Sequence, residues 1–335
     1  MKVLVTGASG RIGANIVARL LKEGMSVIAA VRPRSKRIGK LAALQGDIQV
    51  VECDLTDRAG LAALSAGAEA IVHNGAHLGA GGPLMQFDVT LGSTVTLLES
   101  ARDRADLKRF VQISSSIVYE GPTVRDEPQT EDEADYRITS GPYGAAKIST
   151  ESWCCMFHAR FGVPTTALRL PFVICGKEIL EPSPEASIFG LQGQIGRMEG
   201  RSDAQSFVNE AKSAIETGAG LVAPLNEDGT AHLRHWCDVR DAVEGVWLAL
   251  TKDEATGEAF NIMSRPMDFG EAAETLSDLT GLTVARLKHP DQYRYRFGLE
   301  KAGRLLGYSP RYDGRTIVTD AYRHWNGQDI GVIAT

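Results

Sequence analysis

The chain has 335 residues, of which 43% are hydrophobic and 23% are charged, and its formal net charge at pH 7 is −6. These proportions are typical of a soluble globular protein, and the length suits one large α/β unit with an appended lobe. The acidic balance argues against a nucleic-acid-binding surface. No apolar run reaches the roughly 18 residues that a membrane-spanning helix needs. We therefore expect neither nucleic acid nor a membrane as a partner.

The cysteines bear on the cellular compartment. None of the five shows Cys-x-x-Cys spacing, and Cys154 and Cys155 are adjacent. Neighbouring cysteines cannot easily pair with each other, so we expect reduced and mostly buried thiols. The first predicted strand begins at Val3, which leaves no room for a signal peptide. Both observations predict a cytoplasmic protein.

The first thirteen residues predict a strand, a tight turn and a helix. Val3 to Val5 form an apolar run, glycines follow at positions 7, 10 and 13, and an amphipathic pattern begins at Ile12. In such a turn, backbone N–H groups approach a pyrophosphate, and the helix N-terminus offers unpaired donors and the positive end of its dipole. The alternative is an ordinary glycine-rich turn. The predicted cofactor contacts here are Gly7, Ser9, Gly10, Arg11 and Ile12.

A basic segment follows the second predicted strand, residues 25–31. Arg32 ends this strand, and Arg34, Lys36 and Arg37 follow without any acidic residue. In a dinucleotide fold an acidic residue here accepts from a free ribose 2′-hydroxyl, whereas cations favour a 2′-phosphate. Arg32 together with one of the other cations therefore favours NADP over NAD. The alternative is a solvated basic turn.

Two further strands, residues 48–51 and 70–73, also end in candidate cofactor contacts. Asp54, after the first of them, could accept from the adenine amino group or cap the helix that begins near Asp57. Glycines after the second strand allow close approach of the cofactor, and the loop over 79–83 is flexible enough to act as a lid. The predicted contacts are Asp54, Leu55, Asn74, Gly75 and Ala76.

Two histidines, His73 and His77, lie at the end of the fourth predicted strand. Neither is accompanied by an acidic or thiol partner in the sequence, so we expect no metal site. His77 is instead predicted to contact the substrate.

The fifth predicted strand, residues 109–118, follows a helix over 87–104 and contains three consecutive serines. Parallel sheets place their ligands at the carboxyl ends of their strands. Ser114 is therefore predicted to contact the cofactor, and Ser115 and Ser116 the substrate.

The next helix carries the pair of residues with the most direct chemical meaning. It follows an acidic loop over 126–135, interpreted as a solvated rim, and runs from about Tyr143 to Arg160. Tyr143 and Lys147 are four residues apart and share one helix face. Lowering the pKa of a tyrosine by about three units takes roughly 4 kcal/mol, which an ammonium about 4 Å away supplies at an effective dielectric constant of about 20. The pair predicts a phenol that exchanges protons with an alcohol or ketone, with Ser115 holding the substrate oxygen.

The remainder of the chain departs from regular strand–helix alternation. A sixth strand over 164–174 carries Arg169 and Pro171, and an irregular stretch rich in Pro, Gly and Glu follows. Later segments predict helices over 204–217, 238–250 and 269–280, strands over 259–263 and 283–288, and two final helices.

These patterns predict an α/β protein, a doubly wound parallel-sheet Rossmann fold with a smaller, discontinuous C-terminal lobe. The dinucleotide-binding domain is expected over residues 1–176, rejoined by about 235–263. The substrate-binding lobe is expected over 177–234 and 264–335, with the ligand in the cleft between the two.

The order of the motifs resembles the extended short-chain dehydrogenase/reductases, also called the NAD-dependent epimerase/dehydratase family. The similarity covers most of the chain. It rests on TGxxGxxG at 6–13, SSxxVY at 114–119, YxxxK at 143–147, RPxxVYG at 169–176 and LLGxxP in 302–310.

The resemblance implies roles for individual residues. Ser115 becomes the catalytic hydroxyl, Lys147 also binds the nicotinamide ribose, and Pro171 lies beside the nicotinamide. Arg234 corresponds to an arginine that often meets an anionic substrate group, although a capping or salt-bridge role is equally open. Family members often form homodimers through a four-helix interface, so a homodimer is implied as well.

Two departures from the family pattern narrow the chemistry. Ser116 and Ile117 stand where the sugar-nucleotide dehydratases carry an Asp-Glu pair, so dehydration is disfavoured. The Val31-Arg32 strand end is similar to the reductase branch of the family, which uses NADPH.

Three functions remain open. The first is an oxidoreductase that transfers hydride between NADP(H), or NAD(H), and a secondary alcohol or ketone such as a sugar derivative, with Tyr143 as acid/base, Lys147 as pKa modifier and Ser115 as oxyanion partner. The second is a sugar or sugar-nucleotide epimerase that retains NAD and shows no net redox change. The third is a non-catalytic nucleotide-sensing protein, which the intact catalytic residues disfavour.

Overall fold

The computed structural model describes residues 1–78, 82–119, 123–135, 137 and 141–334. Most of the predicted lid glycines, at 79 and 81, lie outside the described residues. Among the described residues, no helix combines the length and the apolar character of a membrane span.

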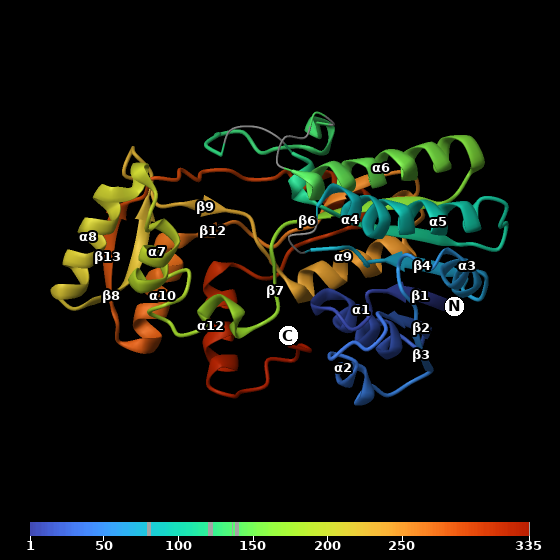
Figure 1. The fold of residues 1–335 in the computed structure, drawn as a ribbon, viewed down its shortest axis with the longest axis horizontal. Coiled ribbons are helices and arrows are strands. Elements are labelled where there is room, and N and C mark those ends of the chain that lie inside the picture. Colours follow the sequence, from blue (N-terminus) through green and yellow to red (C-terminus); the bar gives the residue numbers. More distant parts are fainter. Residues whose placement is uncertain (79–81, 120–122, 136, 138–140, 335) are drawn as a thin grey trace.

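A seven-stranded parallel sheet forms the centre of the larger lobe (Figure 1). Its strand order is β11-β6-β5-β4-β1-β2-β3, so the connections reverse direction between β1 and β4. In open sheets of this type, ligands bind at the carboxyl ends of the strands beside this reversal. The fold is therefore the doubly wound Rossmann type that the sequence predicts. The strands are β1 (Lys2–Thr6), β2 (Ser26–Val31), β3 (Ile48–Glu52), β4 (Ala70–His73), β5 (Arg109–Ser115), β6 (Thr165–Leu170) and β11 (Ala259–Asn261).

Helices cover both faces of this sheet because its strands alternate apolar side chains between the faces. Val3 and Val5 belong to one buried cluster, whereas Leu4 belongs to the cluster on the opposite face. The first face is covered by α1 (Arg11–Lys22), α9 (Val239–Thr251) and α11 (Glu300–Leu306). The second is covered by α3 (Arg58–Ala66), α5 (Gly92–Ala101) and α6 (Pro142–Phe161).

Two predicted strands are shorter in the structure. β5 ends at Ser115, where a 3₁₀ helix, η2 (Ser116–Val118), begins. The sequence predicts one strand over 164–174, but the chain forms β6 and a separate β7 (Val173–Ile174) that pairs with β10 (Cys237–Asp238). Pro171 interrupts them because proline has no N–H for a strand ladder.

The predicted helix over 87–104 is also different. It begins earlier, as α4 (Pro83–Met85) and a π-helical segment η1 (Gln86–Leu91), and α5 ends at Ala101. Pro83 is tolerated at the start because the first turn has no partner for its N–H.

A smaller lobe lies at the opposite end of the molecule (Figure 1). β8 (Ala219–Leu225) and β13 (Thr283–Lys288) form a parallel pair, a pairing that the sequence analysis did not predict. Between the lobes, β9 (Leu233–Arg234) pairs with β12 (Met267–Asp268). The helices packed on β8 are α7 (Leu191–Met198), α8 (Gln205–Glu216) and α10 (Phe269–Thr280).

The remaining helices are short, except the last one. They are α2 (Gly39–Ala42), η3 (Glu131–Glu133), η4 (Lys177–Leu180), η5 (Ser202–Ala204), η6 (Asp253–Ala255) and α12 (Gly314–Trp325). The predicted domain limits stay a prediction. Ala302 and Leu306 of α11 pack in the core of the larger lobe, beside α1 and α9.

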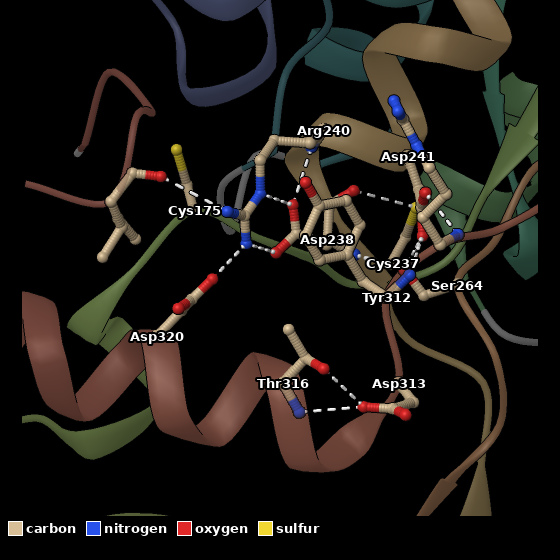
Figure 2. A network of polar contacts seen from close by, with 12 residues as sticks. Cys175, Cys237, Asp238, Arg240, Asp241, Ser264, Tyr312, Asp313, Thr316 and Asp320 are labelled. Carbon is tan, nitrogen blue, oxygen red and sulfur yellow. Dashed lines mark hydrogen bonds and ion pairs between the residues drawn. The ribbon is translucent and has the colours of Figure 1, made fainter.

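A polar network ties α9 to α12 (Figure 2). The Asp238 carboxylate caps α9 by accepting from the Arg240 N–H at 2.8 Å, and it also pairs with the Arg240 guanidinium at 2.7 Å. The same guanidinium pairs with Asp320 of α12 at 2.7 Å. Asp241, one residue further along α9, accepts from the Ser264 hydroxyl at 2.6 Å. Segments from both lobes are therefore joined by buried charges.

Candidate active site

The loop between β1 and α1 brings its glycines into close contact. Gly7 adopts a φ of +64°, and a Cβ on Gly13 would lie 2.2 Å from the Gly7 carbonyl oxygen. No side chain fits at such a distance, so the turn requires glycine. Gly10 caps α1 without a side-chain hydrogen bond. The first-turn N–H groups near Arg11 and Ile12 therefore face the loop as donors for an anion.

The ends of two neighbouring strands lie against this turn. The Asn74 side-chain amide donates to the Gly7 carbonyl at 3.4 Å, and the Gly75 N–H donates to the Thr6 hydroxyl at 3.0 Å. A Cβ on Gly75 would lie 2.8 Å from a methyl carbon of Leu55. The structure thus brings together four of the predicted cofactor contacts: Gly7, Leu55, Asn74 and Gly75.

The basic loop after β2 lies beside the turn as well. Its cations are exposed, Arg32 included, and Arg34 adopts a left-handed φ of +57°. The Ser9 and Ser35 hydroxyls are 3.0 Å apart, which joins the loop to the glycine turn. The predicted contacts Ser9 and Arg32 therefore lie at the same end of the site.

Lys40, at the start of α2, extends this basic group. Its Nζ is buried and has no hydrogen-bond partner in the part of the chain that the structure describes. Burial, and next the Arg37 guanidinium, lower the pKa of Lys40. A buried ammonium without a partner is costly unless an anion binds it. The sequence analysis missed Lys40, although it lies only three residues after the last predicted cation.

Asp54 is held in a turn and does not cap a helix. One carboxylate oxygen accepts from the Thr56 N–H at 2.9 Å and from its hydroxyl at 2.7 Å. These bonds lower the pKa of Asp54. Asp57 is the residue that caps α3, by accepting from the Gly60 N–H at 2.9 Å. Of the two alternatives open for Asp54, helix capping is therefore wrong.

The side chains of two predicted cofactor contacts, Arg11 and Ser114, bind other groups of the protein. The Arg11 guanidinium donates to the Val173 carbonyl at 2.9 Å and lies 3.6 Å from the Glu178 carboxylate. The Ser114 hydroxyl donates to the Glu151 carboxylate. Both side chains are therefore engaged by the protein itself, which leaves fewer of their polar groups for a cofactor.

His73 is a satisfied core histidine. Its two ring nitrogens lie 2.7 Å from the Thr6 hydroxyl and 3.0 Å from the Ser93 hydroxyl. Burial lowers the pKa of His73 to about 3, so the ring is neutral. His77 is half-buried, and its backbone N–H donates to the Thr90 hydroxyl at 3.1 Å. His77 follows Ala76 in the segment after β4.

Ser115, Tyr143 and Lys147 meet at the carboxyl end of β5. The Ser115 hydroxyl accepts from the Ile117 N–H at 3.2 Å, which starts η2, and Ser115 and Tyr143 line one cavity. The Lys147 Nζ lies 5.7 Å from the centroid of the Tyr143 ring. It is buried and donates to the Ile113 carbonyl at 2.7 Å. The helix spacing of four therefore places phenol and ammonium on one side, as predicted.

The sequence predicts a lowered pKa for the Tyr143 phenol, and this prediction is wrong. Burial raises the pKa of Tyr143, and its hydrogen bond with Ser115 opposes the increase. Burial also lowers the pKa of Lys147 to about 8, and the charge of Glu151 opposes that decrease most strongly. The sequence argument included the attraction between the two groups but omitted the cost of burying each of them.

Glu151, which the sequence analysis missed, links the helix of the catalytic residues to the central sheet. It lies on α6 one turn beyond Lys147, and its carboxylate pairs with the Arg169 guanidinium at 2.7 Å and 3.1 Å. Arg169 in turn donates to the Tyr119 hydroxyl at 2.8 Å. The i, i+4 spacing from Lys147 is the signal that could have identified Glu151.

The network continues to the edge of the sheet. The Tyr119 hydroxyl donates to the Asn261 side-chain oxygen of β11 at 2.7 Å. The Asn261 N–H donates to the Glu131 carboxylate at 2.8 Å, and the Glu131 carbonyl accepts from Arg169 at 2.7 Å. Part of the acidic loop is therefore buried in the network, contrary to the prediction of a solvated rim. Its members hold β5, β6, α6 and β11 in one arrangement.

A cavity of about 500 Å³ opens above Ser115 and Tyr143. This volume is typical of small-molecule sites. The lining comes from η2, the β6–β7 break and a segment near the C-terminus, and it is mostly aromatic or apolar. It consists of Ser115, Ser116, Ile117, Tyr119, Thr123, Gln129, Tyr143, Pro171, Phe172, Tyr293, Tyr295 and Phe297.

Arg234 is not one of these lining residues, but it contacts two of them, Tyr293 and Tyr295. Among the described residues it neither caps a helix nor pairs with a carboxylate. Its guanidinium lies 4.2 Å from the centroid of the Tyr293 ring, and its Nε donates to the Tyr295 hydroxyl at 3.3 Å. The Trp236 ring centroid is 5.8 Å away. The prediction of an anion-binding arginine is therefore compatible with its surroundings.

Comparisons with known proteins agree with this geometry. A sequence model of the NAD dependent epimerase/dehydratase family matches residues 3–262. The UDP-glucose 4-epimerase of Corynebacterium glutamicum is 26% identical over 339 residues, covering 96% of this chain and 95% of that protein. The 3 beta-hydroxysteroid dehydrogenase/Delta 5-->4-isomerase of Mycobacterium tuberculosis is 27% identical over 349 residues, covering 97% of this chain and 90% of that protein.

Solved structures are similar along the whole chain. A short-chain dehydrogenase/reductase superfamily protein from Agrobacterium tumefaciens, with bound NAD, has a TM-score of 0.77 and 27% identity, with 98% of both chains covered. The UDP-glucuronic acid 4-epimerase from Bacillus cereus, in complex with NAD, has a TM-score of 0.71 and 24% identity, covering 98% of this chain and 99% of that one. The latter similarity concerns the fold.

Proposed function

Because the chain belongs to the NAD-dependent epimerase/dehydratase family and is an enzyme, we propose that it transfers hydride reversibly between NADP(H) and a secondary alcohol or ketone. The observation that carries this proposal is the meeting of Ser115, Tyr143 and Lys147 at one wall of a cavity. Dehydration is not proposed, because Ser116 and Ile117 occupy the positions of the acidic pair.

The residues around the glycine turn fit a dinucleotide. A Cβ at Gly7 would meet Gly75 and Asn74 within 3.2 Å, so a bare backbone lets the turn lie close to the end of β4, below the unpaired N–H groups at the start of α1 that suit a phosphate. The exposed Arg32 and the other exposed cations of its loop favour a cofactor with a 2′-phosphate. The solved relatives bind NAD, so the preference for NADP rests on the cations of this chain.

Each catalytic residue has a distinct role in the proposal. When bound, the reduced cofactor supplies the hydride that a carbonyl carbon accepts. The Tyr143 hydroxyl gives its proton to the carbonyl oxygen, and the Ser115 hydroxyl donates a hydrogen bond to the same oxygen. The Lys147 ammonium stabilises the phenolate that remains until solvent returns the proton. The alcohol is oxidised by the reverse sequence.

An epimerase is the second candidate, because relatives that align along the whole chain carry that name. It would use the same residues and return the hydride to the opposite face of the substrate. Purified protein that retains nicotinamide would favour the epimerase, whereas ready exchange of the cofactor favours the oxidoreductase. The homodimer implied by the family stays a prediction.

The first test measures oxidation of NADPH and of NADH with a panel of ketones. We expect turnover with NADPH above that with NADH, and a loss of about 10²-fold to 10⁴-fold in Tyr143→Phe, because the proton donor is removed. Cofactor binding should persist in this variant. Tyr322→Phe on α12 is the matched control and should keep full activity. Folded protein that turns over no ketone with either cofactor would contradict the proposal.

A further inference from the structure

The cavity beside the catalytic residues has a wall built from alternate residues of one extended segment. The Tyr293, Tyr295 and Phe297 side chains line it, and the ring centroids of successive members lie 6.4 Å and 5.6 Å apart. Side chains two apart in an extended chain point the same way, which explains why three rings share one wall. Tyr119 adds a fourth ring, 5.1 Å from Phe297.

Backbone bonds hold this segment in place on both sides. The Arg294 N–H donates to the Thr123 carbonyl at 2.8 Å, and the Gly298 N–H donates to the Gln129 carbonyl at 2.8 Å. On the other side, the Leu233 N–H donates to the Tyr293 carbonyl at 2.9 Å. The aromatic wall is therefore a preformed surface, suited to the flat face of a ring.

The cations of this region differ in their partners. Arg294, between two wall residues, pairs with Asp228 at 2.6 Å and with Asp126 at 3.3 Å. Arg234 has no carboxylate within 4.0 Å among the described residues, and its neighbours are the Tyr293 ring and the Tyr295 hydroxyl. Aromatic rings replace only part of the hydration of a guanidinium. Among the described residues, the Tyr295 hydroxyl is the one acceptor for the five N–H donors of Arg234.

We propose that the substrate is a ketone or secondary alcohol built on a flat aromatic or alicyclic ring and bearing one carboxylate, with the ring on the Tyr293–Phe297 wall and the carboxylate on Arg234. This inference rests on the function proposed above and specifies its substrate class. A carboxylate suits Arg234 because it accepts two parallel N–H bonds from one guanidinium.

The test measures binding directly, without cofactor. The probes are 4-acetylbenzoate and 4′-acetylbiphenyl-4-carboxylate, each with its methyl ester, and UDP-glucose as the nucleotide sugar. Calorimetry on the full chain should show at least one acid binding tenfold or more tighter than its ester and tighter than UDP-glucose. Arg234→Gln should remove the difference between acid and ester. Arg296→Gln removes a charge from an exposed position of the same segment and should leave the difference intact.

The same probes are then assayed for turnover with NADPH, which separates the two proposals. Acids that bind in an Arg234-dependent way without turnover would support the ligand class and contradict the oxidoreductase function. Ketones that turn over without preference for the acid would support the function and overturn the ligand class. Equal binding of acid and ester, tighter binding of UDP-glucose, or no binding of either acid at millimolar concentration would also overturn it.

Discussion

Lys147 shows how one buried residue depends on a second that the catalytic motif does not contain. Its ammonium is almost fully buried, and within the described part of the chain it has a single hydrogen-bond acceptor, the Ile113 carbonyl. Burial lowers the pKa of Lys147, and the carboxylate of Glu151 is the strongest opposing influence. We infer that Glu151 is a positioning residue that keeps Lys147 charged at the pH where Tyr143 must exchange its proton.

The residue-scale prediction concerns Glu151→Gln. Removing the carboxylate lowers the pKa of Lys147 further, so the alkaline limb of the kcat/KM–pH profile should move to lower pH by about one unit, equivalent to about 1.4 kcal/mol. The variant should also lose about 3–5 kcal/mol of stability, because Arg169 keeps a buried charge without its partner.

Glu151→Asp is the control for this variant. It retains the negative charge and should retain the position of the alkaline limb, even if its stability falls. If Glu151→Gln lowers the rate but leaves the alkaline limb of the kcat/KM–pH profile at the same pH, Glu151 has only a structural role. That result would contradict the positioning role.

At the scale of elements, two helices define the site. α6 carries Tyr143, Lys147 and Glu151 at successive turns of one face, so its rotation about its axis decides all three positions together. α1 presents its N-terminus to the cofactor groove, and its approach to β1 is limited by the contact between Gly13 and the Gly7 carbonyl. The first turn of α1 therefore tolerates an added side chain less well than α6 does.

Gly13→Ala tests the entry to α1. The added Cβ would meet backbone atoms of Gly7 and Ala8 within 2.9 Å, and backbone cannot rotate away as a side chain can. We expect a loss of about 1–3 kcal/mol in stability from overpacking. We also expect at least tenfold weaker cofactor binding, because the phosphate-binding N–H groups move with the helix.

Gly39→Ala is the matched control. Gly39 begins α2, and a Cβ there would meet no atom within 4 Å. Cofactor binding and stability should be close to those of the unsubstituted chain. If Gly13→Ala binds the cofactor normally, the glycine turn does not position the phosphate as proposed.

On the scale of the whole molecule, buried histidines occur in both lobes. Burial lowers the pKa of His73, in the central sheet, to about 3, and it lowers the pKa of His232 and His235, near the smaller lobe, to about 4. The unfolded chain takes up protons at these residues near a pKa of about 6.5, but the folded chain does not. Stability is therefore complete above that pH and falls as the pH decreases towards 4.

This predicts a marked acid dependence of folding. Each of these three histidines should contribute about 1.4 kcal/mol of lost stability at about pH 5.5, so together they should remove on the order of 4 kcal/mol relative to about pH 7.5. His289 is also buried, and burial lowers its pKa, so it adds to the fall. Chemical denaturation at the two pH values measures the difference. Carboxylates whose pKa values are lowered in the folded chain affect stability mainly below about pH 4, so they do not account for this difference in stability.

His235→Gln isolates one of these contributions. It should reduce the fall in stability between the two pH values by about 1.4 kcal/mol. Stability that does not change between the two pH values would show that the buried histidines are protonated in the folded chain.

The sequence by itself determined the features that depend on near neighbours. The glycine turn, the alternation of strands and helices, and the shared face of Tyr143 and Lys147 follow from backbone geometry over a few residues. Most strand positions, and the return of β11 to the sheet, could be predicted for the same reason. The break between β6 and β7 was missed, although Pro171 marks it in the sequence.

Only the tertiary structure decided burial and charge pairing. The raised pKa of Tyr143, the burial of the Lys40 Nζ and the aromatic surroundings of Arg234 each depend on residues far away along the chain. The physical reason is that desolvation and electrostatic interaction depend on distance in space, which local sequence spacing does not specify.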